Sequence, residues 1–117
     1  MPPAQLTTQI AEKYAVEPDY PWAKHPDYAV FRHPQNRKWF ALAMNVPAHL
    51  LGFAEDDTLL DIVNVKTRPK LAGALRSIDG ILPAYHMNKE HWVGIIIARV
   101  PNDLLWQLIE NSFELTR

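Results

Sequence analysis

Apolar residues recur along the chain at two spacings, and these spacings predict where its helices and strands lie. A repeat of three to four residues, typical of a helix that buries one face, covers residues 3–15. The same repeat follows Thr67, a residue type that caps helix N-termini, and is closed by Gly80. A third helix is predicted from Pro101 onward, where a broad apolar stripe begins.

Five shorter apolar segments, rich in β-branched and aromatic residues, indicate strands. They cover residues 28–33, 37–44, 59–66, 81–86 and 91–99. Pro34 and Asn36 lie in a turn that joins the first two segments as a hairpin. Because Trp39 and Phe40 are neighbours in a strand, one ring is expected to face the core and the other to face outward. Residues 46–53 fit neither spacing, and we interpret them as irregular.

The order of these elements predicts the fold class. Three prolines between residues 17 and 27 predict an extended loop, from which Tyr20 and Trp22 fold back onto the core. The full order is then αβββαββα. It favours an α+β two-layer sandwich, in which three helices pack on an antiparallel sheet of about five strands. At 117 residues the chain fits a single domain, residues 1–117.

Composition narrows the class of protein. Hydrophobic residues make up 48% of the chain, charged residues make up 21%, and the net charge is -1. A protein whose main task is to coat nucleic acid needs a basic surplus, although a local basic face is compatible with a neutral total. The absence of cysteine excludes disulfides and thiolate sites. Since we find no secretory signal and no apolar run long enough for a membrane span, we expect a cytoplasmic protein without membrane contact.

Polar and aromatic side chains gather in residues 83–92, just before the last predicted strand. The candidates for a polar site are His86, Asn88, Lys89, His91 and Trp92. Lysine supplies a charge for phosphate, asparagine can pair with adenine, and tryptophan can stack on a base. Turn chemistry is the structural alternative, which we favour here, because asparagine bonds its own backbone in turns and histidine often satisfies a buried carbonyl.

Further basic residues are candidates for contacts to DNA phosphates. The candidate set is Arg37, Lys38 and Trp39 at the predicted hairpin, Lys66, Arg68, Lys70 and Arg76 around the start of the second helix, and Lys89 in residues 83–92. A helix N-terminus attracts anions through its free N–H groups, and nearby cations strengthen that attraction. An ordinary solvated charged surface is the alternative.

The sequence shows no metal site and no catalytic motif. Neither His86 with His91 nor His25 with His33 has a recognised ligand spacing, and no thiolate is present to complete a site. No phosphate-binding glycine loop or nucleophile elbow occurs. An acid–base pair of His86 and Lys89 lacks a matching carboxylate. We therefore expect no metal, no cofactor and no enzymatic activity.

Residues 83–92 read Pro-Ala-Tyr-His-Met-Asn-Lys-Glu-His-Trp, and this string carries a family resemblance. Weaker matches lie across nearly the whole chain, at Pro21, Trp22, Phe31, Lys38 to Ala41, Val65 to Thr67, Pro69, Leu71 to Arg76, Pro101 to Asp103, Ser112 and Phe113. The pattern resembles the MmcQ/YjbR-like family of small bacterial proteins. The resemblance implies a secretion-chaperone-like fold, also called CyaY-like, and DNA binding in which β-hairpins act as two wings.

Three functions stay open at this point. The first is DNA binding through basic hairpins and the face formed by residues 66–76. The second is a protein-interaction or chaperone-like module that holds a protein partner. The third is a small-ligand site or enzyme that uses His86 and His91. The two histidine rings distinguish the third function from a structural role, since a site requires them to share a pocket.

Overall fold

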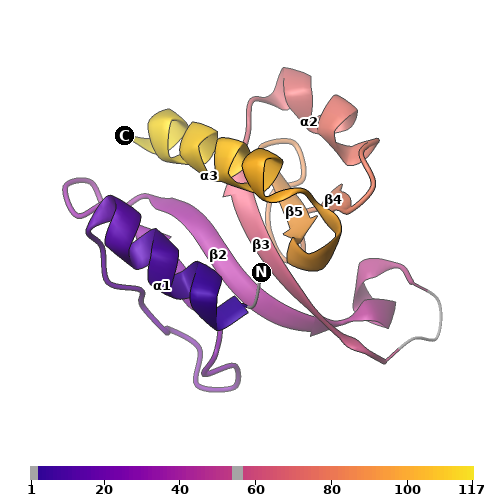
Figure 1. Ribbon diagram of the computed structural model, residues 1–117, viewed down its shortest axis with the longest axis horizontal. Coiled ribbons are helices and arrows are strands. Elements are labelled where there is room, and N and C mark those ends of the chain that lie inside the picture. The colour runs from indigo at the N-terminus through magenta and orange to yellow at the C-terminus, as the bar shows by residue number, and fades with distance from the viewer. Residues whose placement is uncertain (1–2, 54–56) are drawn as a thin grey trace.

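The computed structural model describes residues 3–53 and 57–117, which form one five-stranded sheet covered by helices (Figure 1). The helices are α1 (Pro3–Tyr14), α2 (Pro69–Arg76) and α3 (Asn102–Thr116). The strands are β1 (Ala29–Arg32), β2 (Trp39–Pro47), β3 (Leu59–Lys66), β4 (Ile81–Pro83) and β5 (Trp92–Ile96). They lie in the order β1-β2-β3-β5-β4, and all neighbours are antiparallel. This confirms the predicted α+β class and the order αβββαββα.

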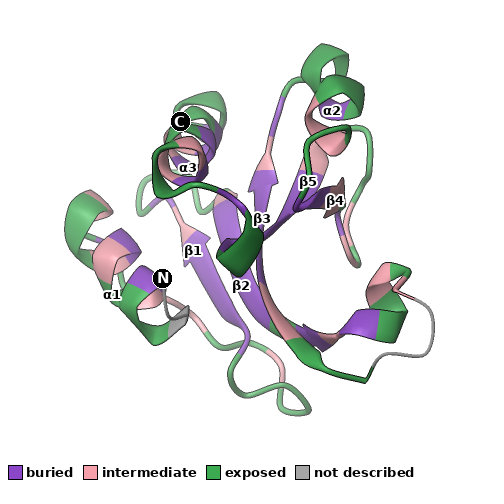
Figure 2. Cartoon of the chain, turned by 45° about the vertical axis from the view of Figure 1, so that its right-hand side comes forward, coloured by how far each residue is buried: buried purple, intermediate pink, exposed green. Residues whose placement is uncertain are grey.

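The sheet has two apolar faces, because successive side chains on a strand point to opposite sides. On the helix face, strand residues pack against the three helices, and this cluster contains Ala29, Phe31, Phe40, Ala41, Ala43, Val63, Val65, Ile81, Val93 and Ile95. On the open face, none of α1, α2 and α3 packs, and the buried apolar strand residues are Val30, Leu42, Met44, Val46, Ile62 and Ile96. Figure 2 shows the consequence: the strands are largely buried, while the outer surfaces of the helices are exposed.

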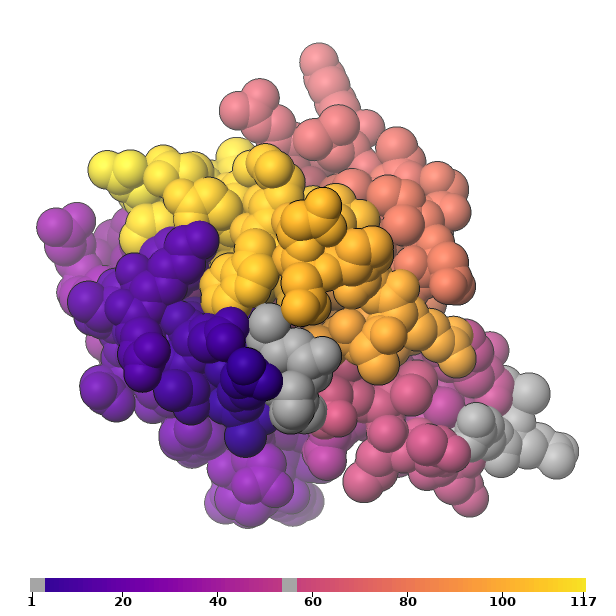
Figure 3. Space-filling view, viewed as in Figure 1, coloured from indigo at the N-terminus to yellow at the C-terminus, as the bar shows by residue number. Residues whose placement is uncertain are grey.

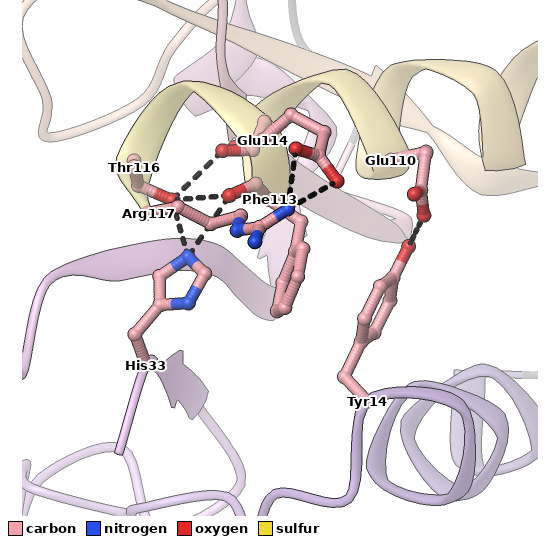
Figure 4. A network of polar contacts seen from close by, with 8 residues as sticks. Tyr14, His33, Glu110, Phe113, Glu114, Thr116 and Arg117 are labelled. Atoms are coloured by element: carbon pink, nitrogen blue, oxygen red, sulfur yellow. Dashed lines mark hydrogen bonds and ion pairs between the residues drawn. The ribbon is translucent and has the colours of Figure 1, made fainter. Parts of the chain in front are cut away.

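Helices α1 and α3 lie side by side over the helix face (Figures 1 and 3). The Tyr14 ring on α1 stacks on Phe113 of α3, with 4.3 Å between ring centroids. The Tyr14 hydroxyl donates to the Glu110 carboxylate (Figure 4). Burial, followed by this carboxylate, raises the pKa of Tyr14, so the phenol remains a neutral donor. Among the described residues, no helix has the length and apolar composition that crossing a bilayer requires.

Several strand ends differ from the sequence prediction. β2 continues through Val46 to Pro47, into a segment that we interpreted as irregular, because Val46 is buried on the open face and pairs with Leu60. A short 3-10 helix, Ala48–Leu51, follows it. β4 ends at Pro83, which has no N–H to extend the ladder, and β5 gives way at Ile97 to a second 3-10 turn.

The start of α2 also differs from the prediction. Its N-cap is Arg68 and not Thr67, and no side chain bonds the free N–H groups there. The cause is Pro69 at the first helical position, which disfavours helical geometry in the residue before it. Arg68 is accordingly extended, with ψ of 139°. The helix is shorter than predicted at its other end too, since it ends at Arg76, and Gly80 with φ of 92° lies in the turn into β4.

The proline-containing loop before β1 covers part of the open face. Trp22 packs onto that face as predicted, but Tyr20 does not, since it is 53% exposed. The reason lies in the backbone, because Asp19 and Val30 exchange both their N–H groups in an isolated bridge. This bridge holds the loop beside the edge of β1 and leaves Tyr20 in solvent.

Candidate functional site

The strand directions bring the predicted DNA-binding residues to one end of the sheet. β1, β3 and β4 finish at this end, while β2 and β5 begin there. We call it the basic end, and its members are Arg37, Lys38, Lys66, Arg68, Lys70, Arg76 and Lys89. They come from the β1–β2 turn, the end of β3, helix α2 and the turn before β5. Segments far apart in the sequence therefore contribute cations to this one end of the sheet.

Few carboxylates neutralise these cations. Asp19 lies 3.5 Å from Arg37 and 2.7 Å from Arg32, the last residue of β1. The Arg76 guanidinium donates to the backbone oxygen of Lys89 at 2.7 Å. Within residues 3–53 and 57–117, Lys38, Lys66, Arg68, Lys70 and Lys89 form no ion pair. Four of these five residues are exposed, and Lys66 is half-buried.

Side-chain bonds hold the β1–β2 turn rigidly against the end of α3. The His33 ring nitrogen Nε2 lies 2.7 Å from Thr116 Oγ1 and 3.0 Å from the Phe113 oxygen (Figure 4). Asn36 donates to the Thr116 oxygen and accepts from the Lys38 N–H. Arg37 takes the left-handed conformation that closes the turn, with φ of 64°. A packed helix thus fixes the backbone that presents the two basic side chains of the turn.

A β-bulge decides which way Trp39 points. Phe31 pairs with Ala41, but Arg32 pairs with Trp39, so Phe40 is an extra residue on β2. Phe40 and Ala41 therefore both face the helices, and Trp39 turns to the open face beside Leu42 and Met44. There it meets Trp22 edge-on, with 5.8 Å between ring centroids, and the Arg32 guanidinium carbon lies 5.3 Å from its ring centre. As predicted, one of the two neighbouring rings is buried in the core. Trp39, however, is packed into an aromatic cluster and is not a free wing tip.

Residues 83–92 form a turn whose polar groups have separate tasks. The Asn88 Oδ1 accepts from the N–H groups of Glu90 and His91, which is the local side-chain bonding expected of a turn asparagine. The His91 backbone oxygen accepts from the Thr67 backbone N–H, and the Trp92 backbone N–H donates to the Asn88 backbone oxygen. The left-handed residue of the turn is not Asn88 but His86, with φ of 62°.

Sequence reasoning missed Asn64, which fixes this turn over the sheet. The side chain lies in the middle of β3 on the open face, is fully buried, and donates from Nδ2 to the Tyr85 oxygen at 2.9 Å. Its Oδ1 has no partner among the described residues. Gly94 pairs with it across the sheet, and a Cβ added there would lie 3.1 Å from that Oδ1. The available signal was an amide between two valines, in the otherwise apolar stretch of β3 from Ile62 to Val65.

A pocket of about 360 Å³ opens on the open face beside the basic end, and we call it the aromatic pocket. Its lining residues are Trp22, His25, Tyr28, Trp39, Leu42, Met44, His86 and Met87. His86 lines it, whereas His91 and Lys89 do not. His86, Lys89 and His91 are therefore not gathered around this pocket. Burial raises the pKa of Tyr28, and the nearby Tyr85 raises it further.

The histidines form no cluster suited to a metal. His33 is buried on the helix face and bonds α3, while the His25 ring stacks on Tyr28 at the open face, 4.4 Å between centroids. Among the residues that the structure describes, no three His, Cys, Asp or Glu side chains come close enough to hold an ion.

Comparison with known proteins identifies the family. The YjbR family model matches residues 11–115. The chain belongs to the YjbR family. It is 46% identical over 109 residues to the uncharacterised protein YyaQ of Bacillus subtilis, a match that covers 92% of each chain. The predicted resemblance to MmcQ/YjbR-like proteins is confirmed.

Solved structures show the same fold. A crystal structure of a Pseudomonas syringae protein superposes with a TM-score of 0.96 over the whole of both chains, at 46% identity. A solution structure of a P. syringae protein, also 46% identical, gives a TM-score of 0.88 and covers all of this chain and 94% of the other. A Deinococcus radiodurans protein with a DUF419 domain matches in fold at 23% identity, with a TM-score of 0.67 over 93% of this chain and 77% of the other.

Proposed function

We propose that this YjbR-family protein binds DNA through the basic end, working in the cytoplasm and without catalysing a reaction. The observation that carries the proposal is that four segments of the chain place cations at the basic end of the sheet. Lys and Arg side chains that neutralise phosphates supply most of the affinity in nucleic-acid binding. Exposed cations without an ion pair among the described residues, such as Lys38 and Lys70, are available for that contact.

The acidic residues explain how a basic end is compatible with a net charge of -1. Asp27, Asp57 and Asp79 stand just before β1, β3 and β4, and all three strands run toward the basic end. Asp103 is in the first turn of α3, whose last turn contacts His33. These carboxylates lie at the opposite end of the molecule. Asp19, Glu90 and Glu114 lie at the basic end, so the charge separation is partial, and it would still orient the basic end toward a polyanion.

Two turns at the basic end support a two-wing mode of DNA binding. One is the β1–β2 turn with Arg37 and Lys38, and the other is the turn that carries Lys89. The end of β3, with Lys66, lies between them in the strand order β1-β2-β3-β5-β4. A duplex laid across this edge would meet cations from both turns and from the start of α2.

A salt titration tests the proposal. Fluorescence anisotropy of a labelled duplex should show binding at low salt, and log K should fall linearly with log salt, by about 0.9 for each phosphate contacted. Lys66→Glu combined with Lys70→Glu should abolish the binding, because both positions change from attraction to repulsion. Undetectable or salt-insensitive binding by the unaltered protein would contradict the proposal.

The matched control is a pair of charge reversals away from the basic end. Lys24→Glu with Arg99→Glu changes the total charge by the same amount, but Lys24 lies in the loop before β1 and Arg99 follows β5 at the opposite end of the sheet. This variant should bind DNA nearly as well as the unaltered protein. Equal losses in the two variants would show that net charge, and not the basic end, controls binding.

A protein partner is the second candidate, favoured by a cleft of about 350 Å³ between α2 and α3. Leu71 and Leu115 line it and are 49% and 36% exposed. Exposed leucines around a cleft are typical of a contact surface. If a second copy of the chain is that partner, light scattering should show a dimer that Leu115→Glu dissociates. A monomer at all concentrations would contradict self-association.

A further inference from the structure

The aromatic pocket has walls of aromatic rings and a floor of aliphatic and thioether groups. Trp22 stands edge-on to both Trp39 and Tyr28, with centroid distances of 5.8 Å and 6.0 Å. Leu42 and Met44 lie at its base, on β2, the strand that contains the bulge. A volume of about 360 Å³ lies within the range of small-molecule sites, roughly 300 to 1,000 Å³.

Three polar groups in this lining have no hydrogen-bond partner among the described residues. The indole N–H groups of Trp22 and Trp39 and the hydroxyl of Tyr28 make no hydrogen bond among the described residues. Among those residues, Asn64 Oδ1 is the one side-chain polar atom that is both inaccessible to solvent and without a hydrogen-bond partner. The Tyr28 hydroxyl therefore reaches solvent, although the residue as a whole is only 8% exposed. The raised pKa of Tyr28 keeps this group protonated and able to donate.

The residue types that line the pocket indicate the class of ligand that fits it. No Lys, Arg, Asp or Glu lines the pocket. An anion would find no free cation, because the Arg32 guanidinium over the Trp39 ring is paired with Asp19, and a cation would find aromatic faces but no carboxylate in the lining, so an uncharged ligand fits best. An aliphatic ligand would leave the indole and phenol donors unused, whereas a flat heteroaromatic ring can stack on the rings and accept hydrogen bonds at its edge.

The backbone above the pocket is strained and firmly held. His86 occupies the left-handed region, which costs energy for a residue with a Cβ and persists only where the surroundings enforce it. The enforcing contact is the buried Asn64 amide, which holds the Tyr85 oxygen next to it. Such strained residues are enriched at ligand sites.

We propose that the aromatic pocket binds a nucleobase-type heteroaromatic ring. Two sources supply this chemistry, a free nucleoside and an unstacked base of a DNA strand. The second source rests on the proposed DNA binding, because Trp39 follows Lys38 and Met87 precedes Lys89 by two residues, so the pocket adjoins the basic end. A strand whose phosphates lie on that end would pass the mouth of the pocket.

The four tryptophans allow a direct test by NMR. Adenosine, guanosine, cytidine and thymidine are titrated while the indole N–H signals are followed. Trp22 and Trp39 should shift, whereas Trp92 and Trp106, which do not line the pocket, serve as internal controls. No saturable shift of Trp22 or Trp39 with any nucleoside up to millimolar concentration, combined with equal affinity for single and duplex DNA, would overturn the inference.

Variants of the two histidines separate binding from folding. His86→Gly removes the ring and relieves the left-handed strain, so the protein should melt no lower than the unaltered chain while nucleoside affinity falls roughly tenfold. His91→Ala is the control, since that residue does not line the pocket, and it should leave the affinity unchanged. Equal affinity in His86→Gly and the unaltered protein would argue against the site.

Oligonucleotides separate the two sources and the two proposals. If an unstacked base is the ligand, a single strand should bind more tightly than its duplex, and His86→Gly should remove only that preference. If nucleosides bind and neither DNA form does, the pocket is a free-ligand site, so the inference stands and the proposed function fails. If DNA binds with the expected salt dependence but His86→Gly and the nucleosides have no effect, the proposed function stands and this inference fails.

Discussion

The two faces of the sheet are made by the same strands but differ in what covers them. Three helices close the helix face, and its strand residues are aliphatic or phenylalanine. The open face is covered by loop and turn residues, among them Trp22, Tyr85 and Met87, and Trp22 and Met87 line the aromatic pocket there. A face sealed by apolar packing serves stability, whereas a face whose rings keep unpaired polar atoms can serve recognition. The difference predicts that substitutions on the two faces have separable effects.

The largest expected effect is on the helix face, where Phe40→Ala removes a fully buried ring. Phe40 contacts Tyr14 and Phe113 as well as Phe31, so the cavity would lie between the sheet and two helices. We expect a loss of about 3 to 5 kcal/mol in the free energy of unfolding, measured by urea denaturation.

Its sequence neighbour on the open face is the matched control. Trp39→Ala removes a larger but only partly buried side chain, and we expect it to cost less stability than Phe40→Ala while reducing nucleoside binding. If the two substitutions cost the same stability, the two faces would be equivalent parts of one core, and the comparison would fail.

A smaller effect is expected at the contact that holds the turn over the open face. Gly94→Ala places a methyl group 3.1 Å from Asn64 Oδ1, so the amide must shift and its bond to the Tyr85 oxygen weakens. We expect a loss of about 1 to 2 kcal/mol in the free energy of unfolding.

A double-mutant cycle tests whether Asn64 is the cause. In the Asn64→Ala background the added methyl group has room, so Gly94→Ala should cost less there, by about 1 kcal/mol. Additive losses in urea denaturation would show that the strain at Gly94 has another origin.

The anchor of the β1–β2 turn provides a third prediction, with an effect of about 1 kcal/mol. Thr116→Val keeps the shape but removes the hydroxyl that bonds His33 and the Ser112 oxygen. Amide hydrogen exchange should then rise at Arg37, whose N–H bonds the His33 oxygen, and stay unchanged in β5. Uniform acceleration throughout the sheet would indicate global destabilisation and not release of the turn.

Much of the fold could be predicted from the sequence because local periodicity and the core agree. β3 has the predicted limits, since Leu60 and Ile62 face one side and Val63 and Val65 the other. The site was harder to predict. The bulge at Phe40 depends on pairing with a second strand, so the sequence alone left open which of two neighbouring rings faces the helices.

The candidate residues show the same limit. The basic residues were identified individually, but their convergence on one edge follows only from the strand order. The aromatic pocket combines a loop, β2 and a turn that are distant in sequence. Asn64 holds the turn because its amide donates to the Tyr85 oxygen, and Tyr85 is 21 residues away along the chain.

The smallest predicted effect is at Asp61, the acidic exception on the helix-face side of β3. Burial raises its pKa, so the folded protein binds this proton more tightly than the unfolded chain does. The ionised carboxylate therefore opposes folding at pH above its folded pKa, and this cost disappears as pH falls below the unfolded value near 3.8. Asp61→Asn should stabilise the protein at pH 7 by no more than about 0.5 kcal/mol, because solvent screens this half-buried carboxylate, and the gain should vanish at acidic pH. Thermal melting of both proteins across this pH range measures it, and a gain that is independent of pH would mean that the carboxylate's charge is not the cause.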